Sequence, residues 1–227
     1  MRPKAVLFDA YGTLFDVLSV GLRAEALFPG RGAALAEAWR VKQIDYTRLV
    51  SMAGPARYQP FSALTRQGLR AAAAQLGLVL GAEAEAQLMA QYERLDPYPE
   101  NRGVLAELQR RGVPCGILSN GDPPMLEAAV AHAGFAPLLA HVISVHATRR
   151  FKVDPAAYAL GPATLGLPAA EILFVSSNAW DALGATWAGY TTLWINRRGG
   201  PPEALEPPPH HTGTTLAAVL DFFSDPA

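Results

Sequence analysis

The chain has 227 residues, and its 19 basic and 20 acidic side chains leave a formal net charge of −1. This balance excludes the overall basic field expected of a nucleic-acid binder, and a hydrophobic share of 50% argues against intrinsic disorder. The lone Cys115 excludes an intrachain disulfide framework and a cysteine-based zinc site. No apolar run approaches the roughly 20 residues of a membrane span, and the start does not resemble a signal peptide. We therefore expect a globular, cytoplasmic protein with no membrane or nucleic-acid partner.

Five short apolar runs predict buried parallel strands, because each has only four or five residues and lacks polar alternation. They are Ala5–Phe8, Cys115–Leu118, His141–Val145, Ile172–Val175 and Thr191–Ile195. Stretches of helical period separate the later runs, at Asp122–His132, Pro155–Leu165 and Ala179–Trp187. Strands that alternate with helices predict an α/β fold with an open, doubly wound parallel sheet of the Rossmann-like kind.

About a hundred residues separate the first run from the second, far more than a single crossover helix needs. Apolar residues recur there at steps of three and four, as from Leu69 to Leu76, which indicates helices. We therefore expect an all-helical cap domain over residues 16–96, inserted into a catalytic core formed by residues 1–15 and 97–227. The stretch Arg197–His211 is rich in Gly and Pro, which predicts an irregular surface loop.

Polar side chains follow the predicted strands at their carboxyl ends, where open α/β sheets bind ligands. In chain order these residues are Asp9, Ser119, Asn120, Lys152, Ser176, Ser177 and Asn178. Each alone is most simply a turn or cap residue. Together they predict one site with a carboxylate, an ammonium, hydroxyls and amides at the same edge of the sheet.

The same segments resemble the motifs of the haloacid dehalogenase superfamily. Residues 9–16 (DAYGTLFD) are similar to its first motif, residues 118–121 (LSNG) to its second, and Lys152 to its third. Residues 174–181 (FVSSNAWD) resemble the fourth motif in the form found in L-2-haloacid dehalogenases. Residues 39–46 (WRVKQIDY), within the insert, support this narrower match. The resemblance spans nearly the whole chain and implies a Rossmann-like core with a helical cap.

Two positions depart from the phosphatases of that superfamily. Those enzymes use a second Asp two residues after the nucleophile, and they hold Mg²⁺ with further carboxylates in the fourth motif. Here the two positions are Tyr11 and Ser177, so that only Asp9 and Asp181 remain for a cation that prefers hard oxygen ligands. A halide leaving group needs no proton. Both departures therefore favour dehalogenation, and we expect neither a metal nor another cofactor.

The resemblance implies a mechanism in which Asp9 attacks C2 of an L-2-haloacid, forming an ester while halide departs. Lys152 would keep Asp9 ionised, because a nearby cation favours the charged form of a carboxylate. Ser119 would hold the substrate carboxylate. Arg40 from the insert, together with Asn120, would receive the departing halide where negative charge develops.

In the second step of this mechanism, Asp181, oriented with Asn178 and Thr13, would position a water that hydrolyses the ester. One inversion at C2 then converts an L-2-haloacid into a D-2-hydroxy acid. The resemblance adds Ser176 to the catalytic set, and it adds five residues around the substrate: Tyr11, Ile44, Phe61, Tyr158 and Trp180. Apolar members of that group would form a wall that excludes water. Ser177 stays open between a turn hydroxyl and a member of the site.

Two other functions remain as alternatives at this stage. A phosphatase of the same superfamily would release phosphate with Mg²⁺, and a non-catalytic binding homologue would keep the fold without turnover. The partners expected for the leading hypothesis are a small 2-haloacid and free halide. The family often forms dimers, so a homodimer is a further prediction.

Overall fold

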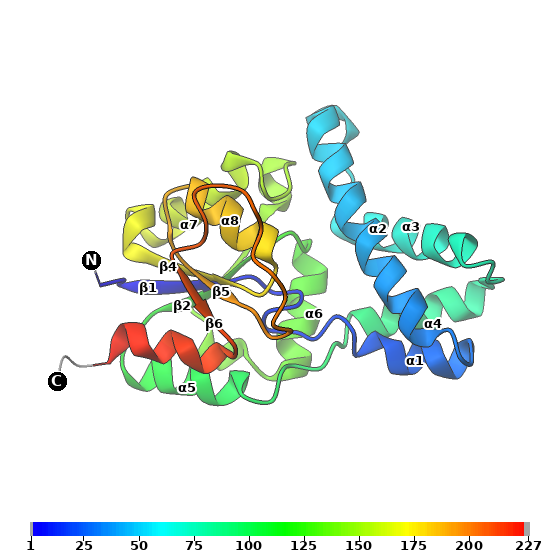
Figure 1. The fold of residues 1–227 in the computed structure, drawn as a ribbon, viewed down its shortest axis with the longest axis horizontal. Coiled ribbons are helices and arrows are strands. Elements are labelled where there is room, and N and C mark those ends of the chain that lie inside the picture. Colours follow the sequence, from blue (N-terminus) through cyan, green and yellow to red (C-terminus); the bar gives the residue numbers. More distant parts are fainter. Residues whose placement is uncertain (1, 225–227) are drawn as a thin grey trace.

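We describe residues 2–224 from a computed structural model, in which a sheet-containing lobe and a helical lobe lie side by side (Figure 1). The sheet is parallel throughout, with strand order β3-β2-β1-β4-β5-β6. Its strands are β1 Ala5–Phe8, β2 Cys115–Ser119, β3 His141–Ser144, β4 Ile172–Ser176, β5 Thr191–Ile195 and β6 His211–Gly213. The five expected strands are therefore present, each end within one residue of its predicted position.

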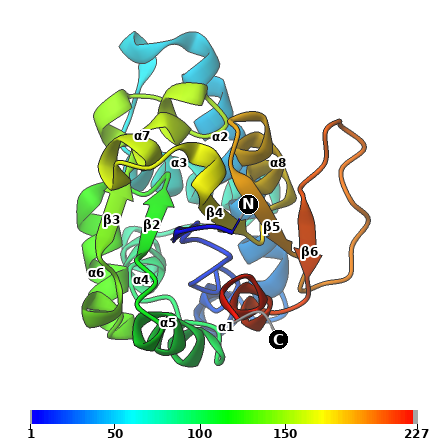
Figure 2. The same cartoon turned by 90° about the vertical axis from the view of Figure 1, so that its left-hand side faces the viewer.

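Helices cover both faces of the sheet, which makes the core doubly wound as expected. The α-helices of this lobe are α5 Asn101–Arg110, α6 Pro123–Ala133, α7 Pro155–Leu165 and α8 Ala179–Trp187. Its short 3₁₀ helices are η2 Ala136–Leu138, η3 Val145–Thr148, η4 Ala169–Glu171 and η5 Leu216–Phe223. Figures 1 and 2 show α7 and α8 on one face, and α5, α6 and the C-terminal η5 on the other. This cover explains why every residue of β1, β2 and β4 is buried.

One strand was not predicted from the sequence, and it begins at His211, the last residue of the expected loop. The irregular stretch that begins after β5 returns to the sheet as β6, where Leu193 pairs with His211 and the N–H of Asn196 donates to the carbonyl of Gly213 at 2.7 Å. β6 has three residues, and His211 and Thr212 are exposed. An edge strand with exposed polar residues carries no apolar run, so the pattern that located the other strands could not detect it.

The helical lobe, defined as residues 20–92, contains α1 Val20–Leu27, α2 Gly32–Ala53, η1 Pro55–Arg57, α3 Phe61–Gln75 and α4 Ala82–Tyr92. α2 is its longest helix, and it ends at Gly54, whose φ of 92° is a backbone conformation that glycine adopts readily. Pro55 then starts the next turn. The all-helical character of this segment agrees with the sequence, while domain boundaries at residues 16 and 96 stay a prediction.

The orientation of the sheet relative to the helical lobe determines where a site can form. The carboxyl ends of the central strands point toward the helical lobe (Figure 1). The chain also reverses its direction of winding around β1, since β2 and β4 flank it. Such a switch point leaves a crevice at the carboxyl ends of the strands. Within residues 2–224, no helix is both long enough and apolar enough to cross a membrane.

Candidate active site

Asp9 is the first residue after β1 and lies at the centre of the site. Its N–H donates to the carbonyl of Val175 at 2.9 Å, which continues the pairing of β1 with β4 and fixes the residue at the sheet edge. Oδ1 accepts from Lys152 Nζ at 3.2 Å, and Oδ2 accepts from Asn178 Nδ2 at 2.8 Å. The Thr13 hydroxyl lies 3.4 Å from Oδ2. The carboxylate is therefore held on both oxygens by side chains from separate segments.

Lys152 connects two carboxylates. Its side chain is fully buried, and Nζ donates to Asp181 Oδ2 at 2.9 Å as well as to Asp9. Nζ also lies 4.7 Å from the centre of the Phe174 ring. The Lys152 N–H donates to Asn120 Oδ1 at 2.9 Å, which anchors the loop that carries it. A buried ammonium between two carboxylates attracts both and compensates part of their negative charge.

Asp181 lies in the first turn of α8 and is fully buried. Its Oδ1 accepts from the Tyr158 hydroxyl at 2.8 Å. Burial raises the pKa of Asp181 from its ordinary 3.8 to about 6, opposed by the Lys152 ammonium and reinforced by the charge of Asp9. A carboxyl with its pKa near neutrality can both accept and return a proton, which suits general acid–base work.

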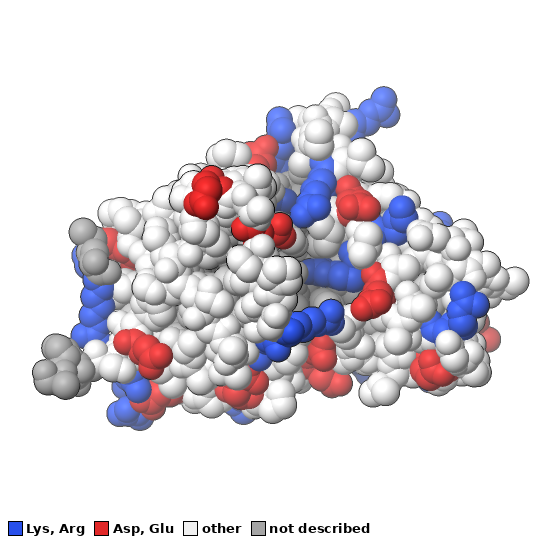
Figure 3. All heavy atoms as spheres, viewed as in Figure 1, with Lys and Arg blue, Asp and Glu red and all other residues white. Residues whose placement is uncertain are grey.

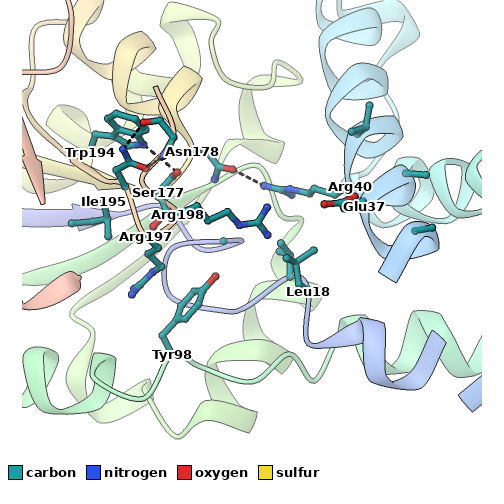
Figure 4. A pocket seen from close by; sticks show the side chains of 17 residues that line it. Leu18, Glu37, Arg40, Tyr98, Ser177, Asn178, Trp194, Ile195, Arg197 and Arg198 are labelled. Atoms are coloured by element: carbon teal, nitrogen blue, oxygen red, sulfur yellow. Dashed lines mark hydrogen bonds between the residues drawn. The ribbon is translucent and has the colours of Figure 1, made fainter. Parts of the chain in front are cut away.

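Arg40 reaches the site from α2 of the helical lobe. Its Nη2 donates to the Tyr11 carbonyl at 3.1 Å. It also donates to Asn178 Oδ1 at 3.1 Å (Figure 4). Its Nη1 donates to Gln43 Oε1 at 2.7 Å. The Asn178 amide therefore joins the two lobes, because its oxygen accepts from Arg40 while its nitrogen donates to Asp9.

The turn between β4 and α8 directs Asn178 into the site. Asn178 occupies the N-cap of α8, yet its side chain makes no capping bond and is available to Arg40 and Asp9. Ser176 Oγ accepts from the Asn178 N–H at 3.1 Å, and the Ser177 N–H donates to Thr13 Oγ1 at 2.8 Å. Ser176 thus shapes the turn. The Ser177 hydroxyl is buried with no hydrogen-bond partner.

A small cavity of about 10 Å³ lies beside Asp9. Nine residues line it, all of them in the set expected from the sequence: Asp9, Tyr11, Arg40, Ile44, Phe61, Ser119, Asn120, Asn178 and Trp180. The five other expected residues do not line it: Thr13, Lys152, Tyr158, Ser176 and Asp181. Tyr158 in particular donates to Asp181. Likewise Thr13 and Asn178, expected beside Asp181, contact Asp9. This volume is about that needed for one water molecule.

The apolar side of the cavity is built around Tyr11. Its ring lies 5.4 Å from that of Phe61 and 5.6 Å from that of Tyr92, measured between centroids. Gly121 packs against the same ring, and a Cβ there would lie 2.8 Å from Tyr11 Cε2. The Tyr11 hydroxyl is buried without a partner, and burial raises its pKa well above 10.0. The phenol is therefore neutral and, with its raised pKa, a very weak acid for protonating a leaving group.

Ser119 and Asn120 form the wall contributed by β2. Ser119 is fully buried, and its Oγ accepts from the Gly121 N–H at 3.1 Å. Asn120 is 6% exposed, and its amide oxygen is occupied by the Lys152 N–H. These bonds fix both side chains at the end of the strand, where they line the cavity with polar groups.

A larger cleft of about 710 Å³ lies on the other side of Arg40 and Asn178, between the two lobes. Its lining includes Arg197, Arg198 and Glu37. Basic side chains lie along this hollow in Figure 3, and Figure 4 shows Arg198 extending into it. Arg40 and Asn178 line both spaces, so they lie between the small cavity and the larger cleft.

Sequence reasoning missed the residues that support Arg40 inside the helical lobe. Gln43, Thr65 and Tyr92 are buried and form hydrogen bonds around its guanidinium. The sequence offered one signal: Gln43 is a polar residue three positions after Arg40, a spacing that places both side chains on the same face of a helix. A search for metal ligands across residues 2–224 finds no group of three or more His, Cys, Asp or Glu side chains.

Comparisons with known proteins match both lobes. Residues 3–189 match the family described as haloacid dehalogenase-like hydrolase. An (S)-2-haloacid dehalogenase from Pseudomonas sp. (strain YL) is 44% identical, over 99% of this chain and 96% of its own length. A crystal structure of an L-2-haloacid dehalogenase is 56% identical, with a TM-score of 0.96 and coverage of 98% and 99%. The L-2-haloacid dehalogenase from Xanthobacter autotrophicus, with chloropropionic acid covalently bound, is 38% identical, with a TM-score of 0.88 and 96% of each chain covered.

Proposed function

Because this chain belongs to the haloacid dehalogenase-like hydrolases, we propose that it converts short L-2-haloacids into D-2-hydroxy acids through an aspartyl ester, without a metal. That it is a dehalogenating hydrolase follows from relatives that match it over nearly its full length. The observation that carries the finer proposal is the Asp9 carboxylate, which lines a small cavity together with Arg40 and a neutral Tyr11.

In the first step, an oxygen of Asp9 attacks C2 of the substrate from the side opposite the halogen. The new C–O bond forms as the carbon–halogen bond breaks, and halide leaves with the bonding electron pair. Lys152 holds the nucleophilic carboxylate in an ion pair, with Nζ 3.2 Å from Asp9 Oδ1. Arg40 faces the same cavity, where its positive charge stabilises the halide as it forms. The covalently bound chloropropionic acid in the Xanthobacter enzyme supports a covalent intermediate.

In the second step, water attacks the ester carbonyl carbon of Asp9. Asp181 accepts the proton of that water, because its carboxylate is held 2.9 Å from the same Lys152 ammonium that contacts Asp9. The tetrahedral intermediate then expels the alkoxide, which takes the proton of the new Asp9 carboxyl and leaves as the hydroxy acid. Asp181 returns its proton to solvent. The products balance as hydroxy acid, halide and one proton.

The stereochemistry follows from which atoms react in each step. C2 is attacked once, in the first step, whereas the second step breaks the bond between the carbonyl carbon and the ester oxygen. One inversion therefore gives a D-2-hydroxy acid from an L-2-haloacid. Ser119 and Asn120 would hold the substrate carboxylate and the halide, while Ile44, Phe61 and Trp180 surround the small alkyl group.

Two residues support metal independence. Tyr11 and Ser177 occupy the positions at which a phosphatase of this superfamily places carboxylates. The carboxylates that remain, Asp9 and Asp181, are already neutralised in part by Lys152. Halide release needs no proton, and Arg40 and Lys152 already supply positive charge, so the chemistry has no step that a metal ion would have to assist.

The test is halide release from (S)-2-chloropropionate in the presence of a metal chelator, with chiral chromatography of the product. The wild type should release halide and form only the D-2-hydroxy acid, whereas Asp9→Asn should release none. Equal release from both proteins, or none from the wild type, would contradict the proposal. Phosphate release that requires Mg²⁺ would favour the phosphatase, and substrate binding without turnover would favour a non-catalytic homologue.

A further inference from the structure

Gln43 is a polar residue with no exposed surface, and it lies on α2 three residues after Arg40. α2 and α3 approach closely at this point, since a Cβ on Gly68 would lie 3.2 Å from the Gln43 backbone nitrogen. Burying an amide costs free energy unless its polar atoms find partners. A buried Gln43 amide therefore requires hydrogen-bond partners for both its oxygen and its nitrogen.

The direction of the Gln43 amide is determined by the hydrogen bonds around it. The Thr65 hydroxyl donates to the Phe61 carbonyl at 2.7 Å, so it can only accept from Gln43 Nε2, also at 2.7 Å. Gln43 Oε1 then faces the opposite way, where it accepts from Arg40 Nη1 at 2.7 Å and from the Tyr92 hydroxyl at 2.9 Å. A flipped amide would direct its N–H groups at the Arg40 guanidinium, which has no acceptor.

This network determines how the Arg40 guanidinium is presented. Nη2 is held by core acceptors, the Tyr11 carbonyl and Asn178 Oδ1, whereas Nη1 is held by Gln43 from within the helical lobe. A long arginine side chain loses considerable rotamer entropy when it is ordered. Thr65 fixes the Gln43 amide, so Gln43 Oε1 is already in place as an acceptor for Arg40. This reduces the number of orientations that the guanidinium can adopt before substrate binds.

We propose that Gln43, oriented by Thr65, is a positioning residue that aims the Arg40 guanidinium at the departing halide. This inference rests on the halide-binding role proposed above for Arg40. A neutral acceptor is required for it, because a carboxylate at position 43 would pair with Arg40 and cancel the charge available to the halide. The amide therefore orients the cation without neutralising it.

The test compares Gln43→Met, Gln43→Glu, Thr65→Val and Thr65→Ser with the wild type on 2-chloropropionate and 2-bromopropionate. Loss of one hydrogen bond to a charged group predicts a kcat about tenfold or more lower for Gln43→Met. Thr65→Val should lower kcat in the same direction, and Thr65→Ser, which keeps the hydroxyl, should restore it. Gln43→Glu should lower kcat and weaken inhibition by added bromide.

Two measurements separate positioning from a purely structural role. Chloride is the poorer leaving group, so the loss of kcat should be larger for the chloro substrate than for the bromo substrate, with KM changed little. A structural defect would lower both rates equally.

Gln67→Met is the matched control, since Gln67 bonds only Gln59 at the exposed surface of α3. Thermal unfolding reports folding, and if Gln43→Met does not fold, the Thr65 pair decides alone.

Parallel assays of Arg40→Ala keep this inference distinct from the proposed function. Full activity in Arg40→Ala would overturn the halide-binding role itself. Loss of activity in Arg40→Ala, combined with wild-type kcat and bromide inhibition in Gln43→Met and Thr65→Val, would overturn only the positioning role of Gln43. Equal losses for both halogens would overturn it as well.

Discussion

Asp181 is the residue whose protonation most directly limits the second step. Burial raises its pKa to about 6, and the carboxyl must be ionised to accept a proton from water. Because the protonated form dominates below this pKa, we expect the rate of ester hydrolysis to fall as pH decreases through about 6. Single-turnover hydrolysis of the preformed ester, measured as a function of pH, reports this fall directly as the acidic limb of the pH–rate profile.

Tyr158 sets the position of that limb. Its hydroxyl bond stabilises the ionised form of Asp181 and so lowers the pKa of that carboxyl. Tyr158→Phe removes the bond, and the pKa of Asp181 should rise, which moves the limb to higher pH. Tyr190→Phe is the control, because the Tyr190 hydroxyl donates to the Tyr158 carbonyl and not to Asp181. A limb that stays in place in Tyr158→Phe would contradict this assignment.

Removal of the Asp181 carboxylate should separate the two steps. In Asp181→Asn, Asp9 is still present beside Lys152, while the proton acceptor for water is lost. We expect one halide per active site to be released rapidly and turnover to stop with the ester in place. Intact-protein mass spectrometry detects the added acyl group. Sustained turnover in Asp181→Asn would show that another group accepts the proton.

At the scale of elements, the turn after β2 holds the aromatic wall in place. A Cβ on Gly121 would lie 2.8 Å from Tyr11 Cε2 and 2.9 Å from Leu126 Cδ2. Gly121→Ala must therefore shift the Tyr11 ring, and we expect a lower kcat/KM and a loss of about 1–3 kcal/mol in the free energy of unfolding. Both are measured by steady-state kinetics and by denaturant unfolding.

Gly103→Ala is the matched control for this substitution. Gly103 lies in α5, and a Cβ there would meet nothing within 4 Å. Alanine is the better helix former, so this variant should gain about 0.5–1 kcal/mol and keep its activity. Wild-type kinetics in Gly121→Ala would show that the Tyr11 ring does not need its present position.

The elements also show how far sequence patterns reach. The buried strands were predictable because short apolar runs without polar alternation are typical of strands covered on both faces, and α7 and α8 begin and end where their periodicity predicted. β6 and η5 were missed. β6 is polar and exposed, so it carries no apolar run. η5 is an apolar 3₁₀ segment, and no flanking sequence signal identifies it as a strand or a helix. β6 pairs with β5, and η5 packs against α5, so both depend on tertiary contacts that a local pattern does not contain.

At the scale of the whole molecule, the site is a closed interface between two lobes. A cavity of about 10 Å³ cannot hold a 2-haloacid, so the lobes must part or side chains must move when substrate binds. Several hydrogen bonds cross this interface. The Phe151 N–H donates to Ser51 Oγ at 2.8 Å, and Ser62 Oγ donates to Asp122 Oδ2 at 2.6 Å. Each of these must break if the lobes separate.

Hydrogen exchange at the Phe151 amide tests this opening. Its bond to Ser51 spans the two lobes, whereas the Asp9 amide bonds Val175 inside the sheet. We expect the Phe151 amide to exchange much faster than the Asp9 amide, and to slow when the ester is trapped in Asp181→Asn. Equal protection of the two amides, measured by NMR, would show that the lobes stay closed and that access depends on side chains.

The composition of the site was more predictable than its contacts. All nine residues that line the cavity were expected. Asp9, Ser119, Asn120 and Asn178 follow from the convergence of parallel strand ends, whereas the other five were implied only by the family resemblance. The pairings were not: Asn178 contacts Asp9 and Arg40, while Tyr158 contacts Asp181. Partners depend on side-chain directions at the interface of the lobes, which no periodicity encodes. The homodimer and the cap boundaries remain predictions.

The central claim is that Asp9 is the nucleophile and that water attacks its ester. A single turnover with excess enzyme in water enriched in heavy oxygen tests it, with mass spectrometry of the product and of the peptide that contains Asp9. We predict an unlabelled product hydroxyl and one heavy oxygen in the Asp9 carboxylate, since the product takes its oxygen from Asp9. Heavy oxygen in the product of the first turnover, with Asp9 unlabelled, would mean that water displaces the halide directly and would contradict the mechanism.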